Sequence, residues 1–391
     1  MSLIVDYYPK YGCGLSRNPY ILEINASELA TYTVKVAGTT VFTGNGVGSF
    51  TVDLSDILEA QFEETEPPTG TDLLLPYRQG MNDYDFRFDI TSKNGESATF
   101  EGRVFKGGIC KRDYRDLRRA DTDIFGEKLN NYSGNFFMTT RTYGWTITVK
   151  ETEIEPLAFI MPIIPGEENS HIIVRENVTG KRIVIEGDHL ALVALNIDAV
   201  RKHFFNTFGI LANAFDVMDV NHPSRVACRI LIEKAPEAVE RCAVRFLNSF
   251  GVFERIDLIG NATIQTSMAQ NEETMFQTLD YYTDIFVKAR NRAEIGQAYK
   301  VSTGVKRGDE LAFIQDMLAS DSVFLTLPDG QEVKVIPSVE QNSRDYTQKE
   351  PEYMDITFLP VEAESNMTPL RTKYGTSRPR IFTSVFSEQF N

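Results

Sequence analysis

Cysteine and histidine are scarce in this chain, and neither is spaced as a metal site requires. The four cysteines, Cys13, Cys110, Cys228 and Cys242, form no CxxC pair, which predicts neither a zinc site nor a dense disulfide framework. The four histidines include no HxH or HxxxH pair. We therefore expect reduced, structural thiols, no bound metal ion and no cofactor.

The motifs of common catalytic sites are also missing. The chain has no GxSxG nucleophile elbow. Gly44, Gly46 and Gly48 lead into an expected strand at 49–53, whereas a phosphate-binding loop leads into a helix. We interpret these glycines as a hairpin turn and predict a protein that is not an enzyme. A Ser/His/Asp triad needs no short spacing, so a hydrolase is the third alternative.

Positive charge and long apolar runs are in short supply. The net charge is −15 and the isoelectric point is near 4.9, which disfavours binding to nucleic acid or to anionic lipid. No run of about 20 apolar residues is present, as a membrane-spanning helix would need. The N-terminus lacks the pattern of a signal peptide. We expect a protein made in the host cytoplasm, with no membrane partner and no evident small-molecule substrate.

Short alternating strands dominate what is present. Tyr84, Phe86, Phe88 and Ile90 alternate with charged residues, and Asn94-Gly95 follows as a hairpin turn. The many aromatic residues suit half-buried sheets. The fold class that these patterns predict is mainly β, as multi-domain antiparallel β-sandwiches with a few short helices.

The C-terminal third has the clearest local signals. Residues 241–260 are predicted to form a hairpin around Asn248–Gly251, with a break in phase near Glu254 that suggests a bulge. Residues 309–319 form the best predicted helix. A strand–helix–strand arrangement there predicts an α+β module.

These segments predict four regions along the chain. They are an N-terminal β-sandwich at 1–150, a middle β region at 151–224, a C-terminal α+β module at 225–360 and an extended tail at 361–391. Residues 62–80 are acidic and rich in proline and glycine, so we expect a long projecting loop. Residues 112–133 are expected to be irregular.

Two groups of residues are candidates for contact with a partner. The sequence KRDYRDLRR is a dense basic patch, interpreted as a contact with nucleic acid or an acidic partner surface, or as a solvated face; we favour a subunit contact. Three phenylalanines in the tail are candidates for docking into a neighbouring subunit. The candidate interface residues are Lys111, Arg112, Arg115, Arg118, Arg119, Phe382, Phe386 and Phe390.

Three elements together resemble a known class of protein. They are GSFTVDLSDIL at 48–58, RFLNSFGVFERIDLIG at 245–260 and GDELAFIQDMLASD at 308–321, the last followed by VFLTL. The arrangement resembles tail-associated virion structural proteins of Bacteroidetes-type phages and prophages, mainly over residues 225–359. The resemblance implies a virion subunit that joins a ring of its own copies and contacts other virion proteins, as a tail, baseplate or connector component. It carries over no catalytic residue.

A carbohydrate-binding β-sandwich of a host-recognition apparatus is the alternative function. Aromatic side chains on loops provide stacking platforms for sugar rings in such modules. The candidates are Tyr7, Tyr8, Tyr11, Tyr77 and Trp145.

Overall fold

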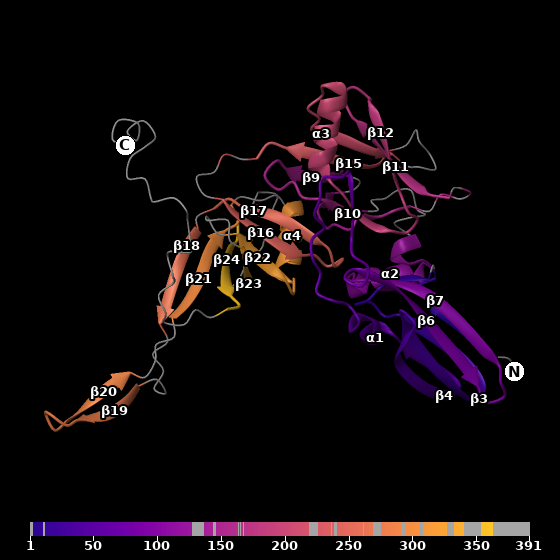
Figure 1. The fold of residues 1–391 in the computed structure, drawn as a ribbon, viewed down its shortest axis with the longest axis horizontal. Coiled ribbons are helices and arrows are strands. Elements are labelled where there is room, and N and C mark those ends of the chain that lie inside the picture. The colour runs from indigo at the N-terminus through magenta and orange to yellow at the C-terminus, as the bar shows by residue number, and fades with distance from the viewer. Residues whose placement is uncertain are drawn as a thin grey trace.

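The computed structural model describes most of the chain and is mainly β, as the sequence predicts. It describes residues 3–10, 12–126, 137–143, 146–162, 164, 166, 168–218, 226–235, 237, 241–260, 262–268, 275–290, 295–304, 308–326, 332–339 and 353–362. The strands of these residues form five sheets that are mostly antiparallel (Figure 1). No helix among the described residues is long and apolar enough to cross a membrane.

The N-terminal sheet has the strand order β1-β3-β6-β7-β2, with β4 also paired to β3. The predicted alternation is confirmed, because Tyr84, Phe86, Phe88 and Ile90 are all buried. Asn94-Gly95 forms the predicted hairpin turn between β6 and β7, with Gly95 at φ 90°. The elements are β1 (Ile4–Tyr8), β2 (Cys13–Leu15), β3 (Ile21–Val36), β4 (Thr39–Asp53), α1 (Ser55–Glu59), β6 (Asp83–Ser92) and β7 (Ser97–Phe105).

The interpretation of Gly44, Gly46 and Gly48 as a turn is wrong. They lie within β4, which pairs with β3 along most of its length, and the chain reverses instead at Ala37–Gly38. A Cβ on Gly44 would collide with the Tyr32 ring, and one on Gly46 would lie 2.7 Å from Phe50. The glycines therefore leave room for aromatic rings to lie across the strand.

Residues 62–80 do not form a projecting loop throughout. Within them β5 (Leu74–Pro76) pairs with β13 (Leu192–Leu195), which in turn pairs with β10 (Leu157–Ile160). Leu75 and Tyr77 are buried. The N-terminal region thus contributes an edge strand to a sheet of the middle region.

A six-stranded sheet crosses both expected domain boundaries, near 150 and near 225. Its order is β12-β11-β14-β15-β9-β8, so β9 lies beside β15, in parallel. Local periodicity in the sequence does not show which distant segments pair. The predicted domain boundaries therefore separate strands that belong to one sheet. The elements are β8 (Thr142–Tyr143), β9 (Thr146–Lys150), β11 (Ser170–Glu176), β12 (Arg182–Gly187), α3 (Ile197–Phe208), β14 (Ala214–Met218) and β15 (Val226–Glu233).

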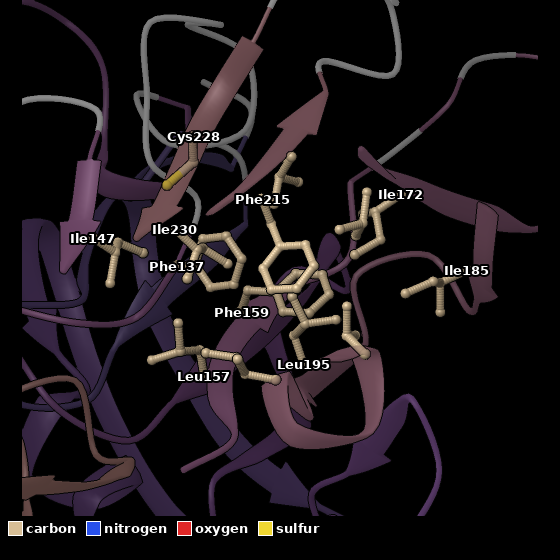
Figure 2. Packing of buried hydrophobic residues seen from close by; sticks show 14 of the residues in the cluster. Phe137, Ile147, Leu157, Phe159, Ile172, Ile185, Leu195, Phe215, Cys228 and Ile230 are labelled. Atoms are coloured by element: carbon tan, nitrogen blue, oxygen red, sulfur yellow. The ribbon is translucent and has the colours of Figure 1, made fainter. Parts of the chain in front are cut away.

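One apolar core joins this sheet to β10 and β13. Figure 2 shows Phe137, Phe159 and Phe215 meeting between the layers, with Ile147 and Ile230 from neighbouring strands beside them. The residues from both sides of the boundary near 150 are therefore buried together.

The C-terminal sheet confirms the hairpin and the helix predicted there. Residues on β16 and β17 pair in antiparallel register without a shift, so the expected bulge near Glu254 is absent. The helix α4 buries Leu311, Ile314 and Met317 against the sheet. The order is β17 (Phe253–Leu258), β16 (Cys242–Leu247), β22 (Val323–Thr326), β23 (Glu332–Ser338), β24 (Asp355–Pro360), β21 (Ile295–Ser302) and β18 (Ala262–Met268), with α4 at Gly308–Leu318.

The fifth sheet is a hairpin formed by β19 (Met275–Asp280) and β20 (Ile285–Arg290) alone. Figure 1 shows it at the opposite end of the molecule from β3 and β4, away from the other sheets. This hairpin is not among the elements predicted from the sequence.

Candidate functional site

The predicted basic patch is a helix, α2 (Lys111–Arg119), so the expectation of an irregular segment is wrong over residues 112–119. Residues 127–133 of that expected segment lie outside the described residues. Cys110 caps its N-terminus, where the thiol accepts a hydrogen bond from the backbone N–H of Asp113 at 3.5 Å. Tyr114 and Leu117 lie one turn apart on the face toward the N-terminal sheet, and the Tyr114 hydroxyl donates to the carbonyl of Pro19 at 3.1 Å. The helix is therefore anchored by one side.

The other side of α2 is a basic face. We give this name to its five exposed cations, Lys111, Arg112, Arg115, Arg118 and Arg119. They fall at positions i, i+1, i+4, i+7 and i+8, which places them on one arc of a helix. The structure thus brings together all five cations that the sequence singled out.

The ion pairs of the basic face are long and exposed. Arg112 and Arg119 lie 4.0 and 3.9 Å from Asp116, and their side chains are 83% and 79% exposed. Arg118 lies 3.4 Å from Glu23 and over the ring of Tyr8. Exposed pairs of this kind contribute about 0–1 kcal/mol, so the guanidinium groups remain free to bind a partner.

The tail phenylalanines Phe382, Phe386 and Phe390 lie outside the described residues. The hairpin β19–β20 instead presents a set of exposed apolar side chains that the sequence analysis missed. We call Tyr281, Tyr282, Ile285 and Phe286 the hairpin tip; their exposed fractions are 86%, 101%, 60% and 68%. The sequence does contain a signal for this turn: Asp280 and Asp284 flank two tyrosines, and aspartate favours turns.

Asp280 holds the loop of the hairpin tip in one conformation. Its carboxylate accepts hydrogen bonds from the Tyr282 N–H at 3.0 Å and the Thr283 hydroxyl at 2.9 Å. These bonds, the Tyr282 N–H first, lower the pKa of Asp280. Asp284 adopts a left-handed conformation at φ 56° and donates its N–H to the Asp280 carbonyl. The exposed tyrosines are therefore carried on an ordered turn.

A buried polar joint lies where residues 139–153 meet the C-terminal hairpin β16–β17. Its centre is Glu254, which accepts hydrogen bonds from the Thr139 hydroxyl and, at 2.7 Å, from the Asn248 amide. Arg141 lies 3.8 Å from Glu254 and 2.7 Å from Glu153. Burial raises the pKa of Glu254 to about 7, although these partners stabilise its charged form.

The joint continues to Asp257. The Asp257 N–H donates to Glu153 at 2.9 Å, and Arg241 and Arg255 lie 3.1 and 3.4 Å from the Asp257 carboxylate. A cavity of about 30 Å³ borders Arg141 and Glu153, which is room for about one water molecule. The carboxylates therefore join two regions of the chain. Sequence reasoning missed this joint because its two sides are more than 100 residues apart.

Of the three described aromatic residues proposed as a sugar platform, Tyr77 lies apart from Tyr7 and Tyr8. Tyr7 packs on Phe100 with ring centroids 4.4 Å apart, and Tyr8 is buried with its hydroxyl bonded to the carbonyl of Thr122. Tyr77 is buried elsewhere, near Glu254. Tyr11 and Trp145 lie outside the described residues. Among the described residues, no group of three His, Cys, Asp or Glu side chains is arranged to hold a metal ion.

Comparison with known proteins gives no family. No family model and no curated protein sequence matches the chain. Among solved structures, an engineered protein is 17% identical over 27% of this chain and 20% of its own, with a TM-score of 0.16. The periplasmic chaperone SfaE is 7% identical over 57% of this chain and 95% of its own, with a TM-score of 0.18.

A third solved structure is SGBP-B of the Bacteroides ovatus mixed-linkage glucan utilization locus, in complex with a mixed-linkage heptasaccharide. It is 10% identical over 89% of this chain and 69% of its own, with a TM-score of 0.16. Scores this low describe no shared overall fold, so these likenesses carry no argument about function.

Proposed function

We propose that this chain is a non-enzymatic structural subunit that works by assembling with copies of itself and with other proteins, as a tail, baseplate or connector component of a phage virion does. One observation carries the proposal. The hairpin β19–β20 forms a sheet of its own and presents four large exposed apolar side chains on an ordered turn.

Such a hairpin is unstable by itself. An isolated two-stranded hairpin is marginally stable in water. Among the described residues neither β19 nor β20 pairs with a third strand, so the outer edges present backbone groups to which another strand can pair. Full burial of each large apolar side chain stabilises by about 1.5–3 kcal/mol. A partner that covers the hairpin tip therefore supplies the packing that the described residues of its own chain do not give it.

The rest of the molecule suits a rigid building block. The N-terminal region contributes β5 to a middle sheet, and the polar joint ties residues 139–153 to the C-terminal hairpin. Side chains that converge in the joint are buried and paired, so this scaffold holds shape and leaves contact to the exposed elements.

The test is the assembly state of the full chain. Native mass spectrometry and electron microscopy of the purified protein should show a closed ring or another defined oligomer. Changing Tyr281, Tyr282 and Phe286 together to Ser should shift the oligomer to monomer with unchanged circular dichroism. Val178→Ser is the matched control, because Val178 is 88% exposed at a different hairpin turn, and it should assemble normally.

The carbohydrate-binding alternative remains as an outcome of a second measurement. Tyr281 and Tyr282 are also side chains on which a sugar ring can stack. A glycan array with the full chain should show no bound sugar if the protein is an assembly subunit. A monomer that binds a glycan and loses it in the tip variant would replace the proposal with the alternative.

A further inference from the structure

We infer that the basic face of α2 docks on an acidic loop of a second copy of this chain. The acidic loop consists of Glu63, Glu64, Glu66 and Asp72. The inference rests on the proposed function, and it adds which two surfaces meet.

The charge of α2 is opposite in sign to that of the whole chain. Five cations and two carboxylates give the helix a net charge of +3 in a chain whose net charge is −15. The rest of the molecule is therefore more acidic than the whole, and a second copy is an acidic partner. Complementary patches speed encounter and fix register between proteins, which is what a subunit contact needs.

The acidic loop is exposed and contains no basic residue. All four of its carboxylates are on exposed residues, and residues 62–77 contain no Lys or Arg. The loop is also ordered. The Lys106 ammonium donates to the Glu63 carbonyl and to the Thr65 hydroxyl, both at 3.0 Å, and Thr65 is buried. Downstream, β5 fixes the chain to the middle sheet.

Among the described residues, each surface makes few ion pairs with its own chain. In the described residues the ion pairs of α2 are made with Asp116 and Glu23. The ion pair of the acidic loop joins Glu64 to Lys334 at 3.7 Å, with the Glu64 side chain 80% exposed. Two unlike surfaces that meet between copies form a head-to-tail contact, which closes into a ring when the rotation permits.

The experiment uses two charge-reversed full chains. In the first, Arg112, Arg115 and Arg119 become Glu. In the second, Glu63, Glu66 and Asp72 become Lys; Glu64 is left alone because it pairs with Lys334. Each variant alone should lose assembly in native mass spectrometry, because like charges then face each other. An equimolar mixture should assemble again, because the reversed helix of one chain meets the reversed loop of the other.

Salt provides an independent readout. Raising salt from about 0.1 M to about 1 M shortens the screening length from about 10 Å to about 3 Å. Assembly of the wild-type chain should weaken over this range, because the attraction between the basic face and the acidic loop is screened. The control variant Val178→Ser should weaken to the same extent.

The outcomes separate this inference from the proposed function. A wild-type chain that assembles while both reversed variants also assemble, or whose reversed variants fail to recover on mixing, overturns the docking inference alone. A wild-type chain that stays monomeric overturns the proposed function as well. Double-stranded DNA that binds the wild type, is lost on reversal of α2 and is unaffected by reversal of the loop would make the helix a nucleic-acid contact and overturn the inference.

Discussion

Gly107 and Gly251 both lie at the contact between the N-terminal region and the turn of the C-terminal hairpin, and each packs against the backbone of the other's neighbours. A Cβ on Gly251 would lie 2.5 Å from the Lys106 carbonyl oxygen, and a Cβ on Gly107 would collide with the Ser249 carbonyl. The Gly108 N–H donates to that Ser249 carbonyl at 2.7 Å, and the Asn82 amide donates to the Gly251 carbonyl. Two regions 140 residues apart in sequence therefore touch through their backbones.

Gly251→Ala should destabilise the protein more than a glycine substitution in an ordinary turn. Gly251 has φ 74°, where a Cβ costs about 1–2 kcal/mol, and the collision with Lys106 adds a cost of about 1–3 kcal/mol for overpacking. The free energy of unfolding, measured by urea denaturation, should fall by the sum of the two.

Gly180→Ala is the matched control for this prediction. Gly180 also has a positive φ, 71°, but a Cβ there would meet nothing within 4 Å. It should show the conformational cost alone. Equal losses for the two variants would mean that the contact with Lys106 does not restrict residue 251.

The turn at Asn248–Gly251 shows which part of the fold local sequence predicts. Asn248 accepts hydrogen bonds from the N–H groups of Phe250 and Val252, so the turn depends on residues next to one another. The same is true of Asn94-Gly95 and of α4. These elements were predicted correctly because their hydrogen bonds and apolar spacing lie within a dozen residues.

Leu75 and Glu254 show why the rest was not predicted. Leu75 stands in an acidic, proline-rich segment, and it becomes a strand only because β13 offers an open edge. Glu254 disturbs the alternation of β17 because Thr139 and Asn248 give its carboxylate a buried site. Both depend on partners far away in the chain, which periodicity does not record.

Leu75→Ala tests whether β5 ties the N-terminal region to the middle sheet. Leu75 is 3% exposed, and truncation of a buried leucine costs about 2–5 kcal/mol. We expect a loss in that range in denaturant unfolding, together with faster proteolytic cleavage between residues 62 and 80. Leu29→Ala, at a side chain 50% exposed, should cost far less. A small loss at Leu75 with unchanged proteolysis would show that β5 is not a structural tie.

The buried joint predicts a pH dependence of stability that comes from Glu254. Its pKa is raised from 4.5 to about 7, mainly by burial. Between these values the native state holds a proton that the unfolded chain has lost. The contribution of Glu254 to the free energy of unfolding is therefore fully present below pH 4.5. It is lost as the pH rises toward 7, by roughly 3 kcal/mol in all.

Glu254→Gln isolates that contribution. Glutamine does not titrate, so the difference in unfolding free energy between the wild type and this variant should change across pH 4.5–7 and level off above it. Glu155, whose pKa burial also raises, acts in both proteins and cancels in the comparison. Asp316, whose pKa burial raises too, repels the Glu254 charge, so that repulsion is part of the measured difference. The lowered pKa of Glu153 acts below this window. A difference that stays constant from pH 4.5 to 7 would contradict the raised pKa.

Arg141 should be the most sensitive charged side chain of the joint. It is 9% exposed, pairs with Glu153 and Glu254, and lies over the Phe313 ring at 4.1 Å. Arg141→Ala leaves two carboxylates buried without their cation, which costs about 3–5 kcal/mol. Arg87→Ala is the control. It removes a cation that is 51% exposed and pairs with Asp89, and exposed pairs are worth about 0–1 kcal/mol.

The loss of unfolding free energy in Arg141→Ala should also depend on pH. Because removal of the Arg141 charge favours protonated carboxyl groups, the loss should be smaller at pH 5 than at pH 8. An equal loss at both pH values would mean that packing on Phe313, and not charge, accounts for the stabilisation by Arg141.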